Sequence, residues 1–534
     1  MKHSLFKHPS VVRKSAFQMS IRSAFTLVVG MFCASAPLQA ADGTWILDGS
    51  DNWTSGYGTP WAGGIVAEGV DATAHFNTLD ITATRAVSLT APLTIGNMNF
   101  ADTSGTSRWN LRDSVLTLQT TSGTPTITND TEVRAYSVLA GTQGFTKEGT
   151  GRLGLYAANT YTGTTRINNG SLYVFNANAI NGDVVMGGGN LTFDNYNVSF
   201  TGNISGSGGR ISRSGGTATL SLLGDNTSSS DVGLYAGAIA LGSGVNNGIG
   251  TGVFIFKSGM LRSADNTART ITNDLSLADG NATMTFGAAQ GETTGLGDLT
   301  FTDTRNISTG GSRNWTVNND TTVTFHNNWS GNTGWTITKE GTGTLVFNGN
   351  ISSSFKGDVT VNDGTLVLNG DQSGFAYGTI INDGGTLGGI GIMDGLITLN
   401  DGGALTPGNS IGTMTGTDLT WNGGGEMQFE LSDTDSSSDQ LLLSGAFTKG
   451  SGSDFIFNFL DTGVAGVTYT LVSSDSTNFV AGDLGYTGLS SGLSGDFVFS
   501  GDELQFQVIP EPTSILLLGV GLVSMLVMFR GRKA

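Results

Sequence analysis

The chain has almost no cysteine, little histidine and few charged side chains. Its 534 residues include one Cys, four His and eight Pro, and 13% of them are charged. A single cysteine excludes a disulfide framework and a cysteine-based zinc site, and four histidines leave little room for His-dependent catalysis. Scarce proline, and glycine without a period of three, exclude collagen. A hydrophobic content of 38% argues against a disordered chain.

Glycine is the residue present in excess. The 82 glycines are roughly double ordinary usage, and they accompany many Asn, Asp, Thr and Ser residues and short apolar runs. This composition is typical of short strands joined by many turns. The chain is also acidic, with a net charge of −18, and residues 41–508 alone hold 17 basic and 42 acidic side chains. Such a surface repels nucleic acid and other anionic polymers, so we expect no nucleic-acid partner.

Residues 1–40 have the organisation of a secretory signal peptide. Basic side chains precede an apolar run from Ala24 to Cys33, and small residues follow it. We predict cleavage between Ala40 and Ala41, with cleavage after Ala36 as the alternative. An N-terminal membrane anchor is the competing interpretation, but the apolar run is too short to span a bilayer. Removal of this segment leaves an exported chain without cysteine.

The C-terminal residues have the organisation of a second targeting signal. Pro510, Glu511 and Pro512 precede an apolar stretch over 513–529, which is followed by the basic residues Arg530, Arg532 and Lys533. We predict a transmembrane helix with its basic end in the cytoplasm and the body of the chain outside. A plain tail anchor is the alternative.

This order resembles the PEP-CTERM sorting signal of Gram-negative bacteria. The resemblance implies an exosortase-like membrane enzyme as a partner, acting near Pro-Glu-Pro while the chain is held in the membrane. It also implies a final location at the cell envelope or surface, or outside the cell.

A degenerate repeat occupies the middle of the chain. One copy runs over 144–174 and a second over 335–368, each with a Lys-Glu-Gly-Thr-Gly sequence and a later Asn-Gly or Asp-Gly pair. Apolar residues alternate with period two after the first glycines, as in strands, and the later pairs are strong turn formers. One such unit cannot bury its apolar face alone, so successive units must stack in parallel. We therefore predict an all-β fold, a right-handed parallel β-solenoid or β-helix.

The repeats resemble the autotransporter-associated β-strand (passenger-type) repeat. Residues 146–174 match the family pattern closely, and 338–368 match except in the middle, where the usual Asn-Thr-Tyr-Thr-Gly is replaced. The resemblance extends, with varying strength, over about 45–415. We therefore divide the chain at these boundaries: signal peptide 1–40, N-terminal solenoid 41–143, repeat solenoid 144–415, C-terminal β cap 416–507 and sorting signal 508–534.

The predicted cap rests on three alternating stretches, which we interpret as antiparallel strands with one wet face. They are Glu426–Leu431, Asp454–Phe459 and Glu503–Val508. A cap is needed because the open end of a solenoid exposes unpaired strand edges.

Motifs with catalytic or metal-binding chemistry are weak. Gly488–Gly492 fits a hydrolase nucleophile pattern, but it lacks a strand-to-helix context, and only His75 and His326 remain after export, so we interpret it as a loop. Asp433, Asp435 and Asp439 can supply oxygen ligands to calcium, but a solvated loop is the preferred interpretation. We predict no metal site and no cofactor.

Two carbohydrate-related alternatives remain open. Polysaccharide lyases occur on solenoids of this kind, but Arg210 and Arg213 lack an accompanying acidic cluster. Trp and Tyr side chains stack on sugar rings, so exposed aromatics can form a carbohydrate-binding face. The candidate aromatics are Trp315, Trp329, Trp335, Tyr156 and Tyr161, for which burial in the solenoid core is the preferred interpretation.

The sequence therefore favours an exported, non-enzymatic structural or adhesin-like solenoid at the cell surface or in the extracellular matrix. Exopolysaccharide or neighbouring cell surfaces are its expected contacts. The alternative is a carbohydrate-binding or polysaccharide-degrading β-helix protein.

Overall fold

The computed structural model describes residues 40–54, 60–277, 282–303, 306–308, 311–330, 336–351, 357–372, 378–460 and 463–511. These residues belong to one compact unit, Ala40–Ala534, and the other unit is Met1–Gln39. The predicted signal peptide up to residue 39 and the predicted transmembrane helix over 513–529 lie outside the described residues. Across the described ranges no helix is long and apolar enough to cross a membrane. The helical turns described are η1 (Ala62–Gly64), η2 (Val245–Gly248), η3 (Asp435–Ser437) and η4 (Ala481–Asp483).

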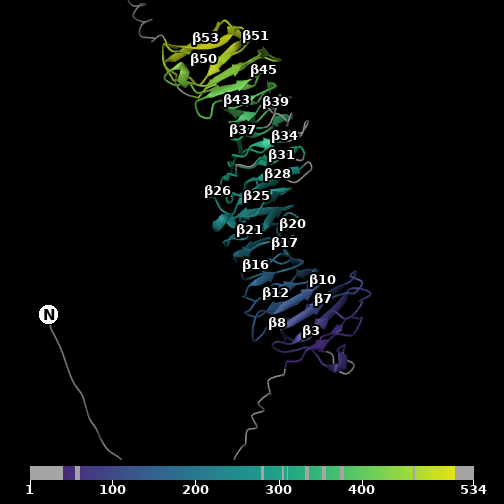
Figure 1. The fold of residues 1–534 in the computed structure, drawn as a ribbon. Helices are drawn as coiled ribbons and strands as arrows, with labels where there is room; N and C mark the ends of the chain where they lie inside the picture. Colours follow the sequence, from purple (N-terminus) through teal and green to yellow (C-terminus); the bar gives the residue numbers. More distant parts are fainter. Residues whose placement is uncertain are drawn as a thin grey trace, which may run out of the picture. The chain divides into compact units, whose positions relative to one another are not determined.

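Two long sheets and one short sheet organise the first half of the described chain (Figure 1). The eight-stranded sheet contains β1 (Gly43–Thr44), β3 (Thr73–Phe76), β6 (Asn97–Phe100), β9 (Thr126–Asn129), β12 (Phe145–Glu148), β14 (Thr165–Ile167), β16 (Val184–Met186) and β19 (Ile204–Gly206). The 11-stranded sheet contains β2 (Asp51–Asn52), β4 (Arg85–Leu89), β7 (Arg108–Asp113), β10 (Glu132–Ala135), β13 (Arg152–Leu155), β15 (Ser171–Val174), β17 (Asn190–Asp194), β20 (Arg210–Ser214), β22 (Asp231–Leu234), β24 (Phe254–Phe256) and β27 (Leu275–Leu277). The three-stranded sheet contains β5 (Leu93–Ile95), β8 (Val115–Leu118) and β11 (Val138–Ala140).

Three further long sheets and a two-stranded sheet organise the second half. The 13-stranded sheet contains β18 (Val198–Phe200), β21 (Thr219–Leu222), β23 (Ala238–Leu241), β25 (Gly259–Ser263), β28 (Ala282–Phe286), β31 (Arg313–Val317), β34 (Ile337–Glu340), β36 (Asp358–Val361), β39 (Gly378–Ile381), β42 (Leu396–Leu399), β45 (Asp418–Trp421), β48 (Ala446–Lys449) and β51 (Ser476–Thr477). The 10-stranded sheet contains β26 (Arg269–Ile271), β29 (Leu299–Phe301), β32 (Thr322–Phe325), β35 (Thr344–Phe347), β37 (Gly364–Leu368), β40 (Gly385–Gly389), β43 (Ala404–Pro407), β46 (Glu426–Phe429), β49 (Phe455–Phe459) and β52 (Leu484–Thr487). The two-stranded sheet pairs β30 (Ile307–Ser308) with β33 (Trp329–Ser330). The seven-stranded sheet contains β38 (Asp371–Gln372), β41 (Ile392–Met393), β44 (Thr413–Gly416), β47 (Gln440–Leu443), β50 (Thr468–Ser473), β54 (Glu503–Pro510) and β53 (Leu493–Ser500).

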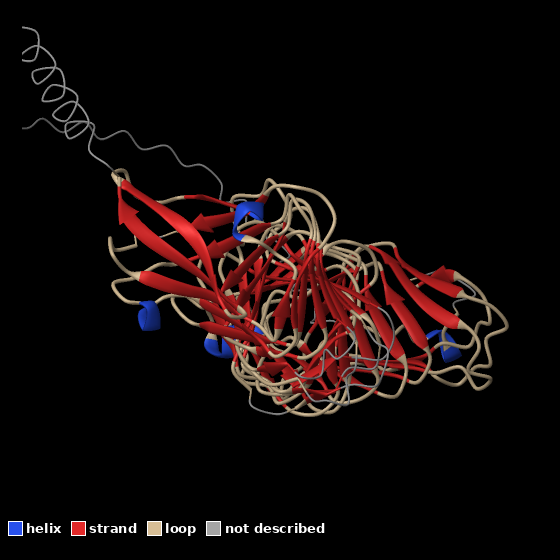
Figure 2. Ribbon diagram, turned by 90° about the horizontal axis from the view of Figure 1, so that it is seen from above, coloured by secondary structure: helices blue, strands red, loops and turns tan. Residues whose placement is uncertain are grey.

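Successive turns of the chain pair in parallel, like position on like position. In the 11-stranded sheet Leu153 pairs with Leu172, Leu172 with Leu191 and Leu191 with Ile211, so one turn takes about 20 residues. Apolar residues therefore return to the same inward place in these turns, and the backbone hydrogen bonds run from turn to turn. Seen along the stack, the strands surround a common interior and the loops lie outside (Figure 2). This register confirms the predicted parallel β-solenoid.

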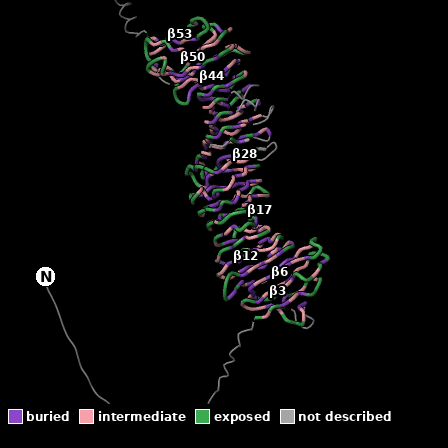
Figure 3. Tube along the Cα trace, viewed as in Figure 1, coloured by how far each residue is buried: buried purple, intermediate pink, exposed green. Residues whose placement is uncertain are grey.

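The core is a set of apolar columns that follow the stack. Inward positions such as Leu153, Leu172 and Leu191 are at most 1% exposed, and in many strands, such as β15, they alternate with half-exposed outward positions (Figure 3). Aromatic rings form columns in the same way: Phe301 stacks on Phe325 with ring centroids 4.5 Å apart. Because burial of each such side chain contributes about 1.5–3 kcal/mol, the columns are the main source of stability in a chain without disulfides.

A tryptophan cluster closes the N-terminal end of the described chain. Trp45, Trp53 and Trp61 are at most 1% exposed, and neighbouring indole centroids in the cluster lie 5.3 Å apart. Trp61 forms an antiparallel bridge with Trp45, so the chain folds back over the first turn. This arrangement covers the apolar interior at an end where no further turn is stacked.

The C-terminal end corrects part of the predicted cap. Only Glu503–Val508 is antiparallel as predicted: it lies in β54, which pairs with β50 and β53 in that sense. The stretches Glu426–Leu431 and Asp454–Phe459 instead form β46 and β49, which pair in parallel with each other. The parallel stack therefore continues past the predicted boundary at 415. Alternation along a strand reports one buried face, and a parallel turn of a solenoid has that property as well.

Candidate functional site

Each passenger-type repeat places one lysine inside the solenoid, where it joins two turns. Lys147 is fully buried, and its Nζ donates hydrogen bonds to the carbonyl oxygens of Glu148 (2.7 Å), Gly149 (2.8 Å) and Asn169 (3.2 Å). Asn169 belongs to the following turn. The ammonium group thus satisfies carbonyls that a tight corner leaves without strand partners.

The second repeat reproduces this corner. Lys339 is fully buried, and its Nζ donates to the carbonyl oxygens of Glu340 (3.0 Å), Gly341 (2.6 Å) and Asp363 (2.9 Å). Two copies separated by 192 positions therefore share one three-carbonyl site. The Lys-Glu-Gly-Thr-Gly sequence is a structural signature, and its lysine does not face solvent as a catalytic group would.

Burial shifts the ionisation of both lysines. It lowers the pKa of Lys147 to about 8, against the opposing effects of Asp130 and Glu148, and it lowers the pKa of Lys339 to about 8, against Asp363 and Glu340. In the unfolded chain both amines return to a pKa near 10.5.

We expect these lysines to make stability rise with pH above 8. Between about pH 8 and 10.5 the unfolded chain binds protons that the folded chain has released, so the free energy of unfolding increases by up to ~1.4 kcal/mol per pH unit for each lysine. Urea unfolding from pH 7.5 to 10 measures this rise as the difference between the wild type and the Lys147→Met/Lys339→Met variant. A difference that does not vary with pH would show that both amines keep their ordinary pKa.

A ladder of asparagine side chains begins at the second repeat and continues through the following turns. The Nδ2 of Asn362 donates to Glu340 (2.8 Å), Asn382 donates to Asn362 (2.8 Å), Asn400 to Asn382 (2.9 Å) and Asn422 to Asn400 (2.9 Å). Each amide therefore bonds the equivalent residue of the preceding turn. Neighbouring residues of the repeat therefore have different partners at this corner: Lys339 bonds the inner carbonyl oxygens, and Glu340 accepts the first hydrogen bond of the asparagine ladder.

The outer face of the 11-stranded sheet carries the densest group of arginines and aromatics. We define the arginine–tyrosine platform as Arg112, Arg134, Arg152, Tyr136, Tyr156, Tyr173 and Phe175. Tyr136 stacks on Tyr156 at 4.6 Å, and Tyr156 stacks on Phe175 at 4.3 Å, each one turn apart. The residues are exposed or half-exposed.

A glycine makes room for the central ring of the platform. A Cβ on Gly154 would lie 2.8 Å from Cε2 of Tyr156, so only glycine lets this ring lie flat over the sheet. Gly233 and Tyr235 repeat the arrangement with a 2.3 Å approach, and the Tyr235 hydroxyl accepts a hydrogen bond from Arg210 (2.6 Å). Sequence reasoning missed the platform, although the recurring Gly-Leu-Tyr at 154–156 and 233–235 was a signal for it.

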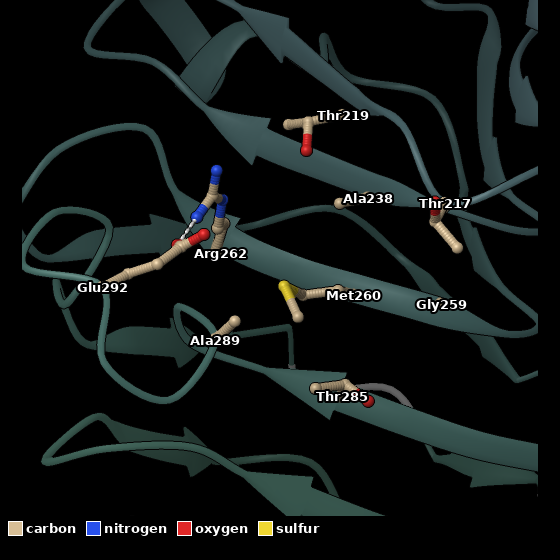
Figure 4. Close-up of a pocket in the computed structure, with 10 residues that line it drawn as sticks. Thr217, Thr219, Ala238, Gly259, Met260, Arg262, Thr285, Ala289 and Glu292 are labelled. Carbon is tan, nitrogen blue, oxygen red and sulfur yellow. Dashed lines mark hydrogen bonds and ion pairs between the residues drawn. The ribbon is translucent and has the colours of Figure 1, made fainter. Parts of the chain in front are cut away.

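A shallow groove of about 370 Å³ lies on the outer face of the 13-stranded sheet (Figure 4). Its floor is formed by residues in register on neighbouring strands, Ala238 beside Met260, with the loop that carries Glu292 at one side. Arg262 and Glu292 point toward each other and form an ion pair (Figure 4). The cation in this groove is thus neutralised, and the remaining polar lining is threonine hydroxyl groups, including that of Thr219. This lining offers weak polar contacts but no nucleophile–base pair.

The predicted processing sites lie at the two ends of the described chain. Ala40 is exposed, and Ala41 begins the folded part through an antiparallel bridge to Glu68. Pro510 ends β54, and the Glu511 amide donates to the Gly492 carbonyl (2.9 Å). Pro512, Arg530, Arg532 and Lys533 lie outside the described residues. Cleavage at either end stays a prediction.

The weak catalytic motifs are not assembled into sites. Gly488–Gly492 lies between β52 and β53, and His326 follows β32, seven rungs away in the same 10-stranded sheet. Arg210 and Arg213 lie on opposite faces of β20, because Arg213 is fully buried and its Nε donates to the Ala218 carbonyl (2.9 Å). Neither motif brings a nucleophile, a base and an acid together.

Two of the three aspartates of the candidate calcium loop accept hydrogen bonds from the backbone, and the third, Asp433, is exposed. Asp439 accepts from the amides of Gly412 (2.8 Å) and Glu430 (2.7 Å), and Asp435 accepts from the amide of Thr470 (2.5 Å). Over the described residues, no group of three His, Cys, Asp or Glu side chains is arranged to hold a metal ion.

The candidate aromatics divide between core and surface. Trp315, Trp329 and Tyr161 are at most 3% exposed, which confirms the preferred interpretation for them. Tyr156 is half-exposed and belongs to the platform, and Trp335 lies outside the described residues. The buried tryptophans offer no surface to a sugar.

The protein is a parallel β-solenoid built from passenger-type turns. This class follows from the turn-to-turn strand register, the buried lysines at the corners and the asparagine ladder on the outside. The family model for the passenger-associated-transport repeat matches residues 145–174 and 337–368, the two segments that contain the buried lysines. The model for the PEP-CTERM protein-sorting motif matches residues 508–533. The chain thus carries two passenger-associated-transport repeats and a PEP-CTERM motif, as the sequence indicated.

The chain can be aligned with a known protein by sequence and with a solved structure by fold. The chain is 28% identical over 253 residues to the adhesin BmaC autotransporter of Brucella suis biovar 1 (strain 1330), which covers 46% of this chain and 7% of the relative. The chain therefore spans a small part of that protein's length. The Hap adhesin of Haemophilus influenzae aligns over 88% of this chain and 72% of its own, with 14% identity and a TM-score of 0.28. The assignment of the fold rests on the strand register, not on this likeness.

Proposed function

We propose that the chain is an exported structural protein, adhesin-like and non-enzymatic, that presents a repetitive solenoid surface at the cell surface or in the extracellular matrix. The observation that carries the proposal is the use of its chemistry-bearing side chains: buried lysines bond corner carbonyls, and aspartates and asparagines bond the backbone or each other. The matched sorting motif and the similarity to an adhesin autotransporter support export and surface contact.

The C-terminal motif is the proposed point of sorting. An exosortase-type membrane enzyme would act near Pro510–Pro512, with the following apolar stretch held in the membrane and the basic tail in the cytoplasm. The described strands end at Pro510, and both Pro510 and Glu511 are exposed, so these two residues are accessible to an enzyme.

Export and sorting can be tested in one set of strains. We expect the wild-type chain to lose mass at both ends and to leave the inner membrane, and the Glu511→Ala/Pro512→Ala variant to keep its C-terminus there. Cell fractionation with intact-mass analysis gives both results, and Asp496→Ala, an exposed acid on β53, is the matched control. Surface attachment should be lost with the sorting variant and kept with the control. A wild-type chain that keeps its full C-terminus in the inner membrane would refute sorting and release.

A further inference from the structure

The arginine–tyrosine platform reverses the charge of the chain over a few turns. Arg112, Arg134 and Arg152 lie on neighbouring strands of the 11-stranded sheet, with Arg108 beside them. Glu132 faces the same group, and Asp113 ends β7 at its rim. The whole chain has a net charge of −18, so this local excess of cations makes the platform distinct from the rest of the molecule.

Ring stacking holds the guanidinium groups of the platform in place. The Cζ of Arg112 lies 5.2 Å from the Tyr136 ring centroid, that of Arg134 lies 5.7 Å from Tyr156, and that of Arg152 lies 3.7 Å from Tyr173. A guanidinium that is already oriented loses less conformational entropy when it binds an anion.

Two of these cations have no acidic partner. Glu132 pairs with Arg134 (2.6 Å) and lies 3.7 Å from Arg108, while no carboxylate among the described residues pairs with Arg112 or Arg152. The Nε atoms of Arg108, Arg152 and Arg262 are all buried without a hydrogen-bond partner, so the ion pairing of the guanidinium groups is what distinguishes the platform. By contrast, Arg262 in the groove of Figure 4 is paired with Glu292. The platform therefore presents oriented donors that the chain does not satisfy.

We propose that the arginine–tyrosine platform binds an acidic polysaccharide, with sugar carboxylates on the guanidinium groups of Arg112 and Arg152. A guanidinium matches a carboxylate with two parallel N–H donors. Neighbouring turns lie about 4.8 Å apart, which is comparable to the length of one pyranose unit. Arg134 pairs in register with Asn110 and Gly154, not with Arg112 or Arg152, so the three guanidinium groups cross the sheet on a diagonal and the polymer would lie obliquely to the stack. The Tyr136 hydroxyl is engaged by Arg134, and the half-exposed rings of Tyr156 and Tyr173 would contact the sugar between the carboxylates.

Charge density distinguishes an acidic polysaccharide from nucleic acid as the ligand, and the required contact area distinguishes it from a second copy of the chain. Nucleic acid carries a charge at every phosphate, and the acidic surface beyond the platform repels such a polymer strongly. A second copy of this acidic chain would need a larger apolar contact, because stable interfaces bury about 1,200–2,000 Å² around desolvated anchors, and the platform is polar and half-exposed. A polyuronate has a lower charge density than nucleic acid and contacts only a narrow strip.

The test measures binding of the full chain, purified in mild detergent, to polygalacturonate and to dextran as the neutral counterpart. Isothermal titration at 50 and 300 mM NaCl should show binding to polygalacturonate only, and weaker binding at the higher salt. We expect Arg112→Gln and Arg152→Gln each to weaken binding about threefold to tenfold, and the double variant to weaken it at least about tenfold. Arg166→Gln is the matched control: it removes an exposed cation, like Arg112, but from the eight-stranded sheet, and should leave affinity unchanged.

Each other outcome overturns the proposal. Equal losses with Arg166→Gln would show nonspecific charge attraction, and equal binding to dextran would show that the carboxylates are not recognised. Tighter, platform-dependent binding of single-stranded DNA would assign the surface to nucleic acid. Self-association by analytical ultracentrifugation that disappears in the double variant would assign it to a second copy. Far-UV circular dichroism spectra that are unchanged in all variants would show that differences in binding do not come from misfolding. The binding assay needs no sorting step, so a failure to bind polygalacturonate leaves the proposed sorting and structural role intact. Likewise, a failure of sorting in cells leaves the binding proposal intact.

Discussion

Replacement of Gly170 by alanine is expected to destabilise its turn of the solenoid by about 3 kcal/mol. Gly170 has a φ of +64°, which costs a side-chain-bearing residue roughly 1–2 kcal/mol. A Cβ there would also lie 2.5 Å from the carbonyl oxygens of both Gly149 and Gly151 in the preceding turn, so the backbones must separate, at a cost of about 1–3 kcal/mol. Gly364 has the same geometry in the second repeat, with a φ of +62°.

A second glycine separates the two contributions. Gly123 has a φ of +75°, but nothing lies within 4 Å of its Cβ position. We therefore expect Gly123→Ala to cost only about 1 kcal/mol, from backbone strain alone. Urea unfolding measures both variants, and hydrogen–deuterium exchange over residues 115–129 and 145–174 reports the local losses for Gly123→Ala and Gly170→Ala. Equal losses would show that the close approach of the turns contributes nothing, and that the Asn-Gly pair is required by its turn conformation alone.

Replacement of Trp315 by alanine is expected to cost about 3–5 kcal/mol, the range for a large aromatic removed from a core. Trp315 is fully buried, and its ring stacks on Phe286 at 5.8 Å and meets Phe325 edge-on at 5.4 Å. The vacated volume cannot collapse, because the strands on either side are held in register by their own turns. Thermal unfolding and exchange of the amides of β28, β31 and β34 would report the loss.

The matched control is an aromatic on the surface. Tyr196 is 48% exposed, so Tyr196→Ala should change the free energy of unfolding by no more than about 0.5 kcal/mol. Trp315→Ala should also leave binding of polygalacturonate unchanged in the fraction that stays folded. A small cost for Trp315→Ala, together with weakened sugar binding, would return this tryptophan to the carbohydrate-binding role that its sequence neighbourhood left open.

The repeats were predictable from sequence because stacking repeats the same demands at each turn. Lys147 and Lys339, with the glycines that follow them, recur at equivalent places because both of these corners present three carbonyls to one ammonium. The interior position of the lysine was not predictable. Lysine is almost never fully buried, and only the arrangement of the corner carbonyls makes the site suitable for it.

The predicted C-terminal cap and the arginine–tyrosine platform show two different limits of prediction from the sequence. Alternation in Glu426–Leu431 predicted a strand correctly but not its partner, because parallel and antiparallel neighbours leave the same pattern of one buried face. The platform was missed because its members come from successive turns. Arg112 lies over Tyr136, and Tyr136 stacks on Tyr156, only once the register is set.

The sequence by itself determined that this chain stacks its strands, where many of its turns fall, and that a sorting motif follows the body. Those properties depend on local preferences: period-two alternation, glycine after Asn or Asp, and an apolar stretch before basic residues. Only the tertiary structure decided which tryptophans are core, which arginines remain unpaired and which rings form one surface. Those properties depend on the pairing of residues about 20 positions apart, and a shift of one residue in that register moves every side chain of a strand to the opposite face.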